Sequence, residues 1–211
     1  MPQKLKKGME RIRHSNNNKG ALYYSNLTIT DHNLQLLEKG NISYYGDYLE
    51  VLWKSLAFGC TMVFNRELVS YILKYKTPLY SIHDSWLYRV AKFIGSDIFF
   101  DCNSYILYRQ HGKNAIGQRA TKLTDKSICN IIISLKRRFR PRKHEIQRVI
   151  QEIYDVASSD MEEREINYSL IALNYNKKHG TKIQMLNFEG IEKRPFWIRL
   201  LWYNKVLFNM I

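Results

Sequence analysis

The sequence predicts an α/β layer over residues 1–117, followed by a helical region over residues 118–211. Strand-like segments alternate with segments of helical periodicity as far as about Gly117, which is typical of α/β proteins. Beyond that point a strongly apolar segment turns basic, and from residue 144 onward apolar residues recur at helical spacing. Hydrophobic residues make up 45% of the 211 residues and charged residues 25%, so we expect a folded domain with room for a small appendage.

The first region divides into alternating elements. Residues 3–13 predict a short basic helix, and residues 21–30 (ALYYSNLTIT) predict a strand with a turn after it. The next segments are predicted as helix, buried strand, helix, helix, and one or two strands, over residues 48–56, 58–65, 66–75, 84–94 and 97–112. This order indicates a sheet with helices packed on it.

The second region is predicted to be helical. Apolar residues follow a helical period over residues 144–159 and again over residues 163–180, where Gly180 is a typical stop signal. Residues 194–211 (RPFWIRLLWYNKVLFNMI) predict an aromatic and basic C-terminal helix.

The net charge and the cysteine pattern indicate which binding partners and which cellular compartment to expect. The formal net charge of +14 favours polyanionic partners, such as nucleic acid, anionic lipid or nucleotide phosphate. Cys60, Cys102 and Cys129 form no CxxC pair, which argues against a disulfide framework or a structural zinc site. We expect a reducing, cytoplasmic location, because the sequence has neither a signal-peptide core nor an apolar run of the ~18 residues that a membrane span needs.

The stretch Tyr80–Gly95 (YSIHDSWLYRVAKFIG) places His83 and Asp84 at a predicted helix start, beside Trp86. One interpretation is structural, because Asp is a favoured N-cap residue whose side chain accepts the free N–H groups of the first turn. The other interpretation is functional, with Asp84 as a catalytic carboxylate held by the helix end. The residues of this stretch alone leave both open.

Three motifs occur in order: GCTMVFNR at 59–66, HDSW at 83–86 and YRQHGKNAIG at 108–117. In this order they resemble the C-terminal half of bacterial family 2 glycosyltransferases, above all the rhamnosyltransferase-like enzymes that build cell-surface polysaccharides. Upstream, MPQKLKKGMERI is similar to the segment after that family's nucleotide-sugar site. The resemblance covers residues 1–117 and implies part of a GT-A-type layer that lacks its N-terminal half.

The resemblance implies transfer of a sugar such as rhamnose, with inversion, from a nucleotide sugar to a saccharide or lipid-linked acceptor. Asp84 matches the carboxylate that takes the proton of the attacking hydroxyl, and such a weak nucleophile needs a base. His83 and Trp86 would flank the acceptor, since aromatic side chains suit sugars. Gly59 and Cys60 match the strand and loop behind the donor and acceptor sites.

The resemblance also implies which residues contact the nucleotide-sugar donor. His111 matches the family's late histidine near the diphosphate, commonly a metal ligand, and Arg109 and Lys113 are placed to meet phosphate charge. Full-length members hold Mg²⁺ or Mn²⁺ at an Asp-rich motif in the N-terminal half. Here Asp31 and Asp47 are isolated, so we expect a fragment that is inactive alone and works with a separate nucleotide-binding half.

Two interpretations from other classes stay open. The basic stretch Lys136–Arg148 favours a nucleic-acid-binding module, although no recognised DNA- or RNA-binding signature accompanies it, so nucleic acid is the weaker expectation. The C-terminal helix carries Arg199 and Lys205 among aromatic residues. It could lie in the headgroup plane at the inner face of the membrane or pack on the preceding helices.

Overall fold

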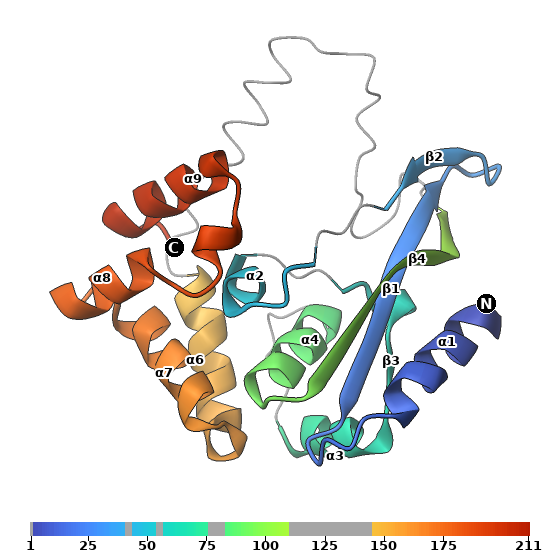
Figure 1. Cartoon of the computed structure of the whole chain (residues 1–211), viewed down its shortest axis with the longest axis horizontal. Helices are drawn as coiled ribbons and strands as arrows, with labels where there is room; N and C mark the ends of the chain where they lie inside the picture. Colours follow the sequence, from blue (N-terminus) through green and yellow to red (C-terminus); the bar gives the residue numbers. More distant parts are fainter. Residues whose placement is uncertain (1, 41–43, 54–56, 76–82, 110–144) are drawn as a thin grey trace, which may run out of the picture.

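The computed structural model describes residues 2–40, 44–53, 57–75, 83–109 and 145–211. It contains a mixed four-stranded sheet with helices on it, and a set of helices beside the sheet (Figure 1). The predicted α/β class is therefore confirmed, and the described part of residues 118–211 is helical. The predicted boundary near residue 117 lies outside the described residues.

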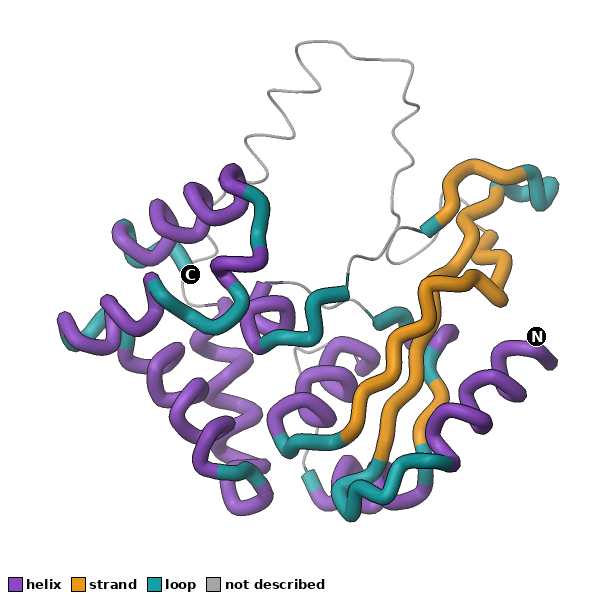
Figure 2. The backbone as a smooth tube through the Cα atoms, in the orientation of Figure 1, coloured by secondary structure: helices purple, strands orange, loops and turns teal. Residues whose placement is uncertain are grey.

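The sheet is built around β1 (Ala21–Thr30). Strand β4 (Asp97–Arg109) runs parallel to β1 along its whole length, while β2 (Leu36–Lys39) and β3 (Val63–Phe64) pair with it antiparallel (Figure 2). Because β4 occupies one edge of β1, the two short strands share the other edge near its opposite ends. Nine of the ten β1 residues are buried, which explains why its sequence alternates only roughly.

Helices cover both faces of the sheet. Helix α1 (Pro2–Arg13) approaches closely at Gly8, where an added Cβ would lie 2.7 Å from Cγ2 of Val63 and 3.1 Å from the ring of Tyr23. Helices α3 (Arg66–Lys74) and α4 (His83–Phe93) pack on the opposite face, where Leu22 and Tyr24 join the main core. Neighbouring β1 residues thus point to opposite faces, as in any strand.

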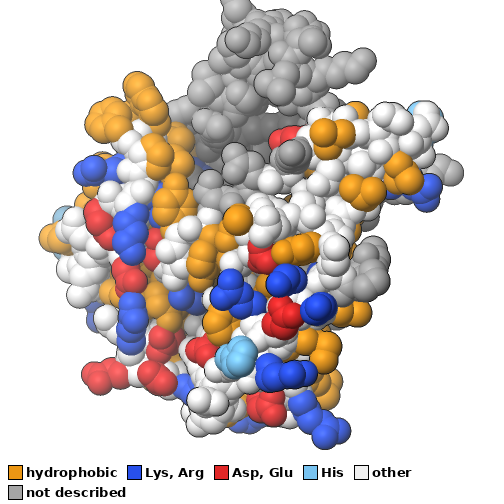
Figure 3. Space-filling view, turned by 45° about the vertical axis from the view of Figure 1, so that its right-hand side comes forward, with side chains coloured by type: hydrophobic (Ala, Val, Ile, Leu, Met, Phe, Trp, Pro, Cys, Tyr) orange, Lys and Arg blue, Asp and Glu red, His pale blue; other side chains and the backbone are white. Residues whose placement is uncertain are grey.

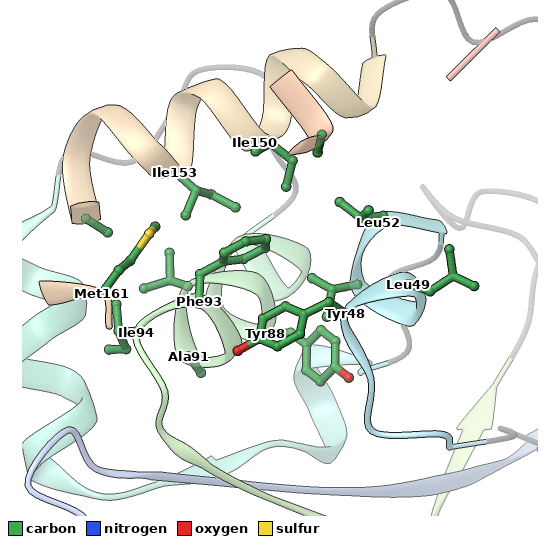
Figure 4. Close-up of a cluster of buried hydrophobic side chains, with 14 of the residues drawn as sticks. Tyr48, Leu49, Leu52, Tyr88, Ala91, Phe93, Ile94, Ile150, Ile153 and Met161 are labelled. Atoms are coloured by element: carbon green, nitrogen blue, oxygen red, sulfur yellow. The ribbon is translucent and has the colours of Figure 1, made fainter. Parts of the chain in front are cut away.

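One hydrophobic core joins the layer to the helices that follow it. The C-terminal helices are α6 (Glu145–Ala157), α7 (Glu163–Asn174), α8 (His179–Leu186) and α9 (Phe196–Leu207). Ile150 and Ile153 of α6 lie over Phe93 of α4, with Leu52 of α2 (Tyr48–Trp53) at the side (Figure 4). Burying one such side chain contributes about 1.5–3 kcal/mol, so this contact makes the two regions interdependent.

The buried strand predicted over residues 58–65 is wrong for most of its length. Residues Gly59–Thr61 form a 3-10 turn, η1, and only Val63–Phe64 are in a strand. The backbone N–H and the hydroxyl of Thr61 each donate to the Phe58 carbonyl at 2.8 Å, which closes the turn. Asn65 then accepts from the Ala21 N–H at 2.8 Å and caps α3 through the Leu68 N–H at 3.3 Å, so the strand cannot continue.

The helix predicted over residues 163–180 is two helices. Helix α7 ends at Asn174, and Gly180, which we expected to stop a helix, lies inside α8. Strand β2 was not predicted. It follows a turn in which the Asp31 carboxylate accepts the N–H groups of Asn33 and Gln35 at 2.8 and 2.9 Å.

Candidate functional site

The candidate site is centred on Asp84 in the first turn of α4. The helix begins at His83, so Asp84 lies inside the first turn rather than at the N-cap, where its negative charge still favours the helix N-terminus. The Gly59 N–H donates to Oδ2 of Asp84 at 3.1 Å, and the Ser85 N–H donates to Oδ1 at 2.7 Å. Each carboxylate oxygen is therefore oriented by one backbone donor, and the half-buried side chain keeps acceptor capacity.

Gly59 fits closely against the start of α4. A Cβ at this position would lie 3.2 Å from Nε2 of His83 and 3.3 Å from Cβ of Asp84. The turn η1 can approach α4 this closely because position 59 has no side chain. The first two sequence motifs, 24 residues apart from Gly59 to His83 in the chain, thus meet in space.

Lys4 is a member of this cluster that the sequence did not predict. Its ammonium donates to the carbonyls of Cys60 and Met62 at 3.0 and 3.3 Å. The Cys60 side chain is exposed overall, yet partial burial of its thiol raises the pKa of that group. The Lys4 charge opposes this rise and the Asp84 carboxylate adds to it, which places the three groups in one electrostatic environment. The only sequence signal for Lys4 was its charge, because 56 residues separate it from Cys60.

His83 and Trp86 have different positions. His83 is exposed at the surface beside Gly59, as an acceptor-side residue needs to be. Trp86 is 1% exposed and belongs to the main core, and within the described residues its Nε1 has no hydrogen-bond partner. Its indole therefore supports α4 from beneath, and it is not offered to a ligand as the acceptor-pocket assignment assumed.

The far end of β4 lies near the same loop. Phe58, the residue before Gly59, packs with Tyr108 against a small cluster formed by Leu27, Ile29 and Ile106. Arg109 follows Tyr108 as the last residue of β4, is exposed, and pairs in register with Thr30. His111 and Lys113 lie outside the described residues, so the convergence of His111 with Asp84 stays a prediction.

A second carboxylate, Asp101 on β4, is less suited to accept a proton. Its oxygens accept from the Tyr23 and Tyr105 hydroxyls at 3.0 Å each, and from the backbone and side-chain N–H groups of Asn103 at 2.9 and 2.8 Å. Burial alone would raise the pKa of Asp101, but these hydrogen bonds outweigh it and hold the pKa below its usual value. A carboxylate so fully occupied is a weak base.

Neither a metal site nor a membrane-spanning helix is found among the described residues. Within them, no group of three or more His, Cys, Asp and Glu side chains comes together as a metal site. Asp47, one of the two aspartates upstream of Asp84, is instead ion-paired with Arg194, and Asp31 holds a turn. No helix in the described ranges has both the length and the apolar content to cross a bilayer.

Comparisons with protein-family models, with curated protein sequences and with solved structures found no match.

Proposed function

We propose that this chain forms the acceptor side of an inverting glycosyltransferase of the family 2 type, with a partial GT-A-like layer and Asp84 as the catalytic base. One observation carries the proposal: the Gly59 N–H and the Asp84 carboxylate are hydrogen-bonded at 3.1 Å. Two motifs that resemble that family are thereby joined at the start of one helix, around a half-buried carboxylate. Each of its oxygens accepts one backbone N–H, and a carboxylate oxygen can accept more than one hydrogen bond.

The reaction follows from what this carboxylate can do. An acceptor hydroxyl donates its proton to Asp84 while its oxygen attacks the anomeric carbon of the donor. The bond from that carbon to the diphosphate breaks, and the nucleoside diphosphate leaves with the electron pair. Attack from the side opposite the leaving group inverts the anomeric configuration. A base within hydrogen-bond reach typically contributes 10²–10⁴-fold to the rate of such a step.

The partners are assigned by charge and chemistry. The donor is a nucleotide sugar, such as one carrying rhamnose, and the acceptor is a saccharide or a lipid-linked saccharide. We assign two cations to phosphate charge: Lys4, whose ammonium donates to the Cys60 carbonyl, and Arg109, the last residue of β4. Among the described residues, no group of His, Cys, Asp and Glu side chains comes together that could hold Mg²⁺ or Mn²⁺, so we assign the family's metal ion to the nucleotide-binding half. The resemblance assigns the nucleoside pocket to the family's nucleotide-binding α/β half.

The test combines the chain with the nucleotide-binding α/β half of a family 2 glycosyltransferase. We expect the chain alone to transfer no sugar, and the combination to transfer labelled sugar from a panel of nucleotide sugars to a membrane extract. Asp84→Asn keeps the shape of the side chain and removes its basicity, so it should lower the rate at least about 10²-fold.

The matched control is Asp155→Asn, an exposed carboxylate on α6 that lies outside the cluster. It should leave the rate unchanged. Transfer by Asp84→Asn at the rate of the unaltered chain would contradict the proposal, and so would turnover by the combined halves that requires neither Asp84 nor Gly59.

A further inference from the structure

Among the described residues, helix α9 packs on the molecule through one side. Trp202 and Val206 are fully buried, and the Trp202 indole N–H donates to the Met185 carbonyl of α8 at 2.9 Å. The ammonium of Lys182 on α8 also donates to the Leu207 carbonyl at 3.0 Å. These contacts set which face of α9 points inward.

The opposite face is apolar and exposed. Five large side chains of α9 and its C-terminal end are 44–71% exposed: Phe196, Trp197, Leu200, Leu207 and Phe208. At about 100° per residue they fall within an arc of about 120°. Figure 3 shows hydrophobic side chains gathered in this part of the surface, at the upper left. Single exposed apolar residues are normal, but a continuous face of aromatic and leucine side chains indicates an interaction site.

Positive charge borders this face. Arg199 and Lys205 project about 60° beyond the two sides of the apolar arc, by the same helical geometry, and Lys193 is exposed just before the helix. Residues 193–211 contain no Asp or Glu. An apolar face with cations along both borders is complementary to a bilayer surface, where acyl chains lie beneath anionic headgroups.

We propose that the face formed by Phe196, Trp197, Leu200, Leu207 and Phe208 docks in the headgroup region of an anionic lipid bilayer. Trp197 is the main anchor, since Trp favours the boundary between hydrocarbon and water. A second copy of this chain fits less well, because a two-fold contact through the same face would bring its bordering cations together. Duplex nucleic acid offers no apolar surface for these side chains.

Flotation of the full chain with vesicles tests the proposal. One vesicle set is phosphatidylcholine alone, and the other is an equal mixture of phosphatidylcholine and phosphatidylglycerol. We expect the chain to float with the mixed vesicles and more weakly, or not at all, with the neutral set. The double variant Phe196→Ser/Trp197→Ser should bind the mixed vesicles at least about tenfold more weakly, because it removes apolar area that the bilayer buries.

Two further variants separate the causes. Leu73→Ser removes an equally exposed side chain, 79% exposed on α3, and should float like the unaltered chain. Lys193→Glu/Lys205→Glu should lose the preference for the anionic vesicles. Circular dichroism and thermal melting show whether each variant is folded. Absence of flotation by the unaltered chain overturns the proposal, as does equal binding by the Phe196/Trp197 variant. A dimer that this variant dissociates, without any vesicle binding, assigns the face to a second copy instead. None of these readings needs a sugar donor, so the proposed transfer reaction is tested separately.

Discussion

Gly59 is the residue on which the position of Asp84 depends most directly. It supplies the N–H that orients one carboxylate oxygen, and its lack of a side chain admits His83 and Asp84. Position 59 therefore supplies a hydrogen bond and also has to lack a side chain. Adding a single methyl group tests the second requirement, because alanine keeps the backbone N–H.

We predict that Gly59→Ala lowers the transfer activity of the combined halves about tenfold, with a loss of stability below about 1 kcal/mol. The added Cβ would lie 3.2–3.3 Å from His83 and Asp84, so both must shift by a few tenths of an ångström. Small displacements of a catalytic group are costly to the rate. Initial rates and urea unfolding measure the two effects.

Gly180→Ala is the matched control for this variant. No heavy atom lies within 4 Å of a Cβ at that position, which is inside α8. Alanine should there leave activity unchanged and stabilise the helix by about 0.5–1 kcal/mol. Equal activity of the Gly59 and Gly180 variants would show that the contact with Asp84 does not position the base.

At this scale the sequence predicted part of the candidate site. The motif order indicated Gly59, His83 and Asp84, and the structure brings them together. The sequence could not indicate Lys4. Its contact with Cys60 depends on how α1 crosses the sheet, and no local pattern connects the two residues. The sequence also could not distinguish an exposed Trp86 from a buried one, because the helix that carries it has apolar residues on more than one face.

Among the elements, α3 and η2 (Ser158–Asp160) are joined by one acid. The Lys74 ammonium donates to Asp160 at 2.7 Å and the Tyr75 hydroxyl donates to it at 2.6 Å. Burial would raise the pKa of Asp160, but these hydrogen bonds outweigh it and lower the pKa below its usual value. The link ties the end of α3 to the turn after α6.

This link makes a prediction about pH. A carboxylate whose pKa is lower in the folded state stabilises the fold above its unfolded pKa of about 3.9, and this contribution is lost as the pH falls through the folded pKa. Asp160→Asn should therefore be less stable than the unaltered chain near neutral pH, by about 1 kcal/mol. The difference should shrink below about pH 4. Urea unfolding across this pH range measures it.

Asp155→Asn is the comparison for this prediction too, because Asp155 is exposed and its carboxylate accepts a hydrogen bond from Gln151 of its own helix at 2.7 Å. Its stability should follow that of the unaltered chain at every pH. A constant difference between Asp160→Asn and the unaltered chain from pH 7 to pH 3 would mean that the Asp160 charge does not contribute.

Most elements could be predicted because their patterns are local. The helices at 3–13, 66–75 and 84–94 and the strand at 21–30 match observed elements within a residue or two. The segment 58–65 was wrongly predicted as a strand because its apolar residues are held by a turn. That turn depends on the hydrogen bond between Asn65 and Ala21, which is a tertiary contact. Gly180 was wrongly predicted to end a helix because the next helix, α8, begins at His179, so that this glycine lies in the first turn of α8.

For the whole molecule, a buried ion pair links the two regions in addition to the shared core. Arg194 donates to both oxygens of Asp47 at 2.7 and 2.9 Å, with the two side chains 6% and 1% exposed, and its guanidinium lies 3.7 Å from the Tyr45 ring centre. Asp47 also caps α2 by accepting the Glu50 N–H at 3.0 Å. These residues are 147 positions apart, so no local pattern predicted the pair.

We predict that Asp47→Asn lowers the free energy of unfolding by about 3–5 kcal/mol, because it leaves the Arg194 charge buried without its partner. Asparagine is itself a good N-cap, so the cap of α2 is kept and the loss reports the charge pair. Guanidinium unfolding, followed by far-ultraviolet circular dichroism, provides the measurement.

The double variant Asp47→Asn/Arg194→Met removes both charges and should recover part of the lost stability. Hydrogen exchange adds a spatial check. Amides of β1 and α7 should lose protection together in the unaltered chain, since one core contains residues from both. A loss below 1 kcal/mol for the single variant would mean that the ion pair contributes little to the joint between the regions.

The exposed thiol of Cys60 lies in the same electrostatic environment as the Asp84 carboxylate, and Cys102 is exposed on the edge strand β4. Cys60 is a suitable attachment point for a small fluorophore, and Cys102 serves as an internal reference on the same molecule. Because the pKa of the Cys60 thiol is raised, we expect Cys60 to be alkylated slowly at neutral pH and faster as the solution becomes alkaline. A saccharide seated against α4 would shield that sulfur from the reagent, so a footprint of this one atom reads out occupancy without any turnover.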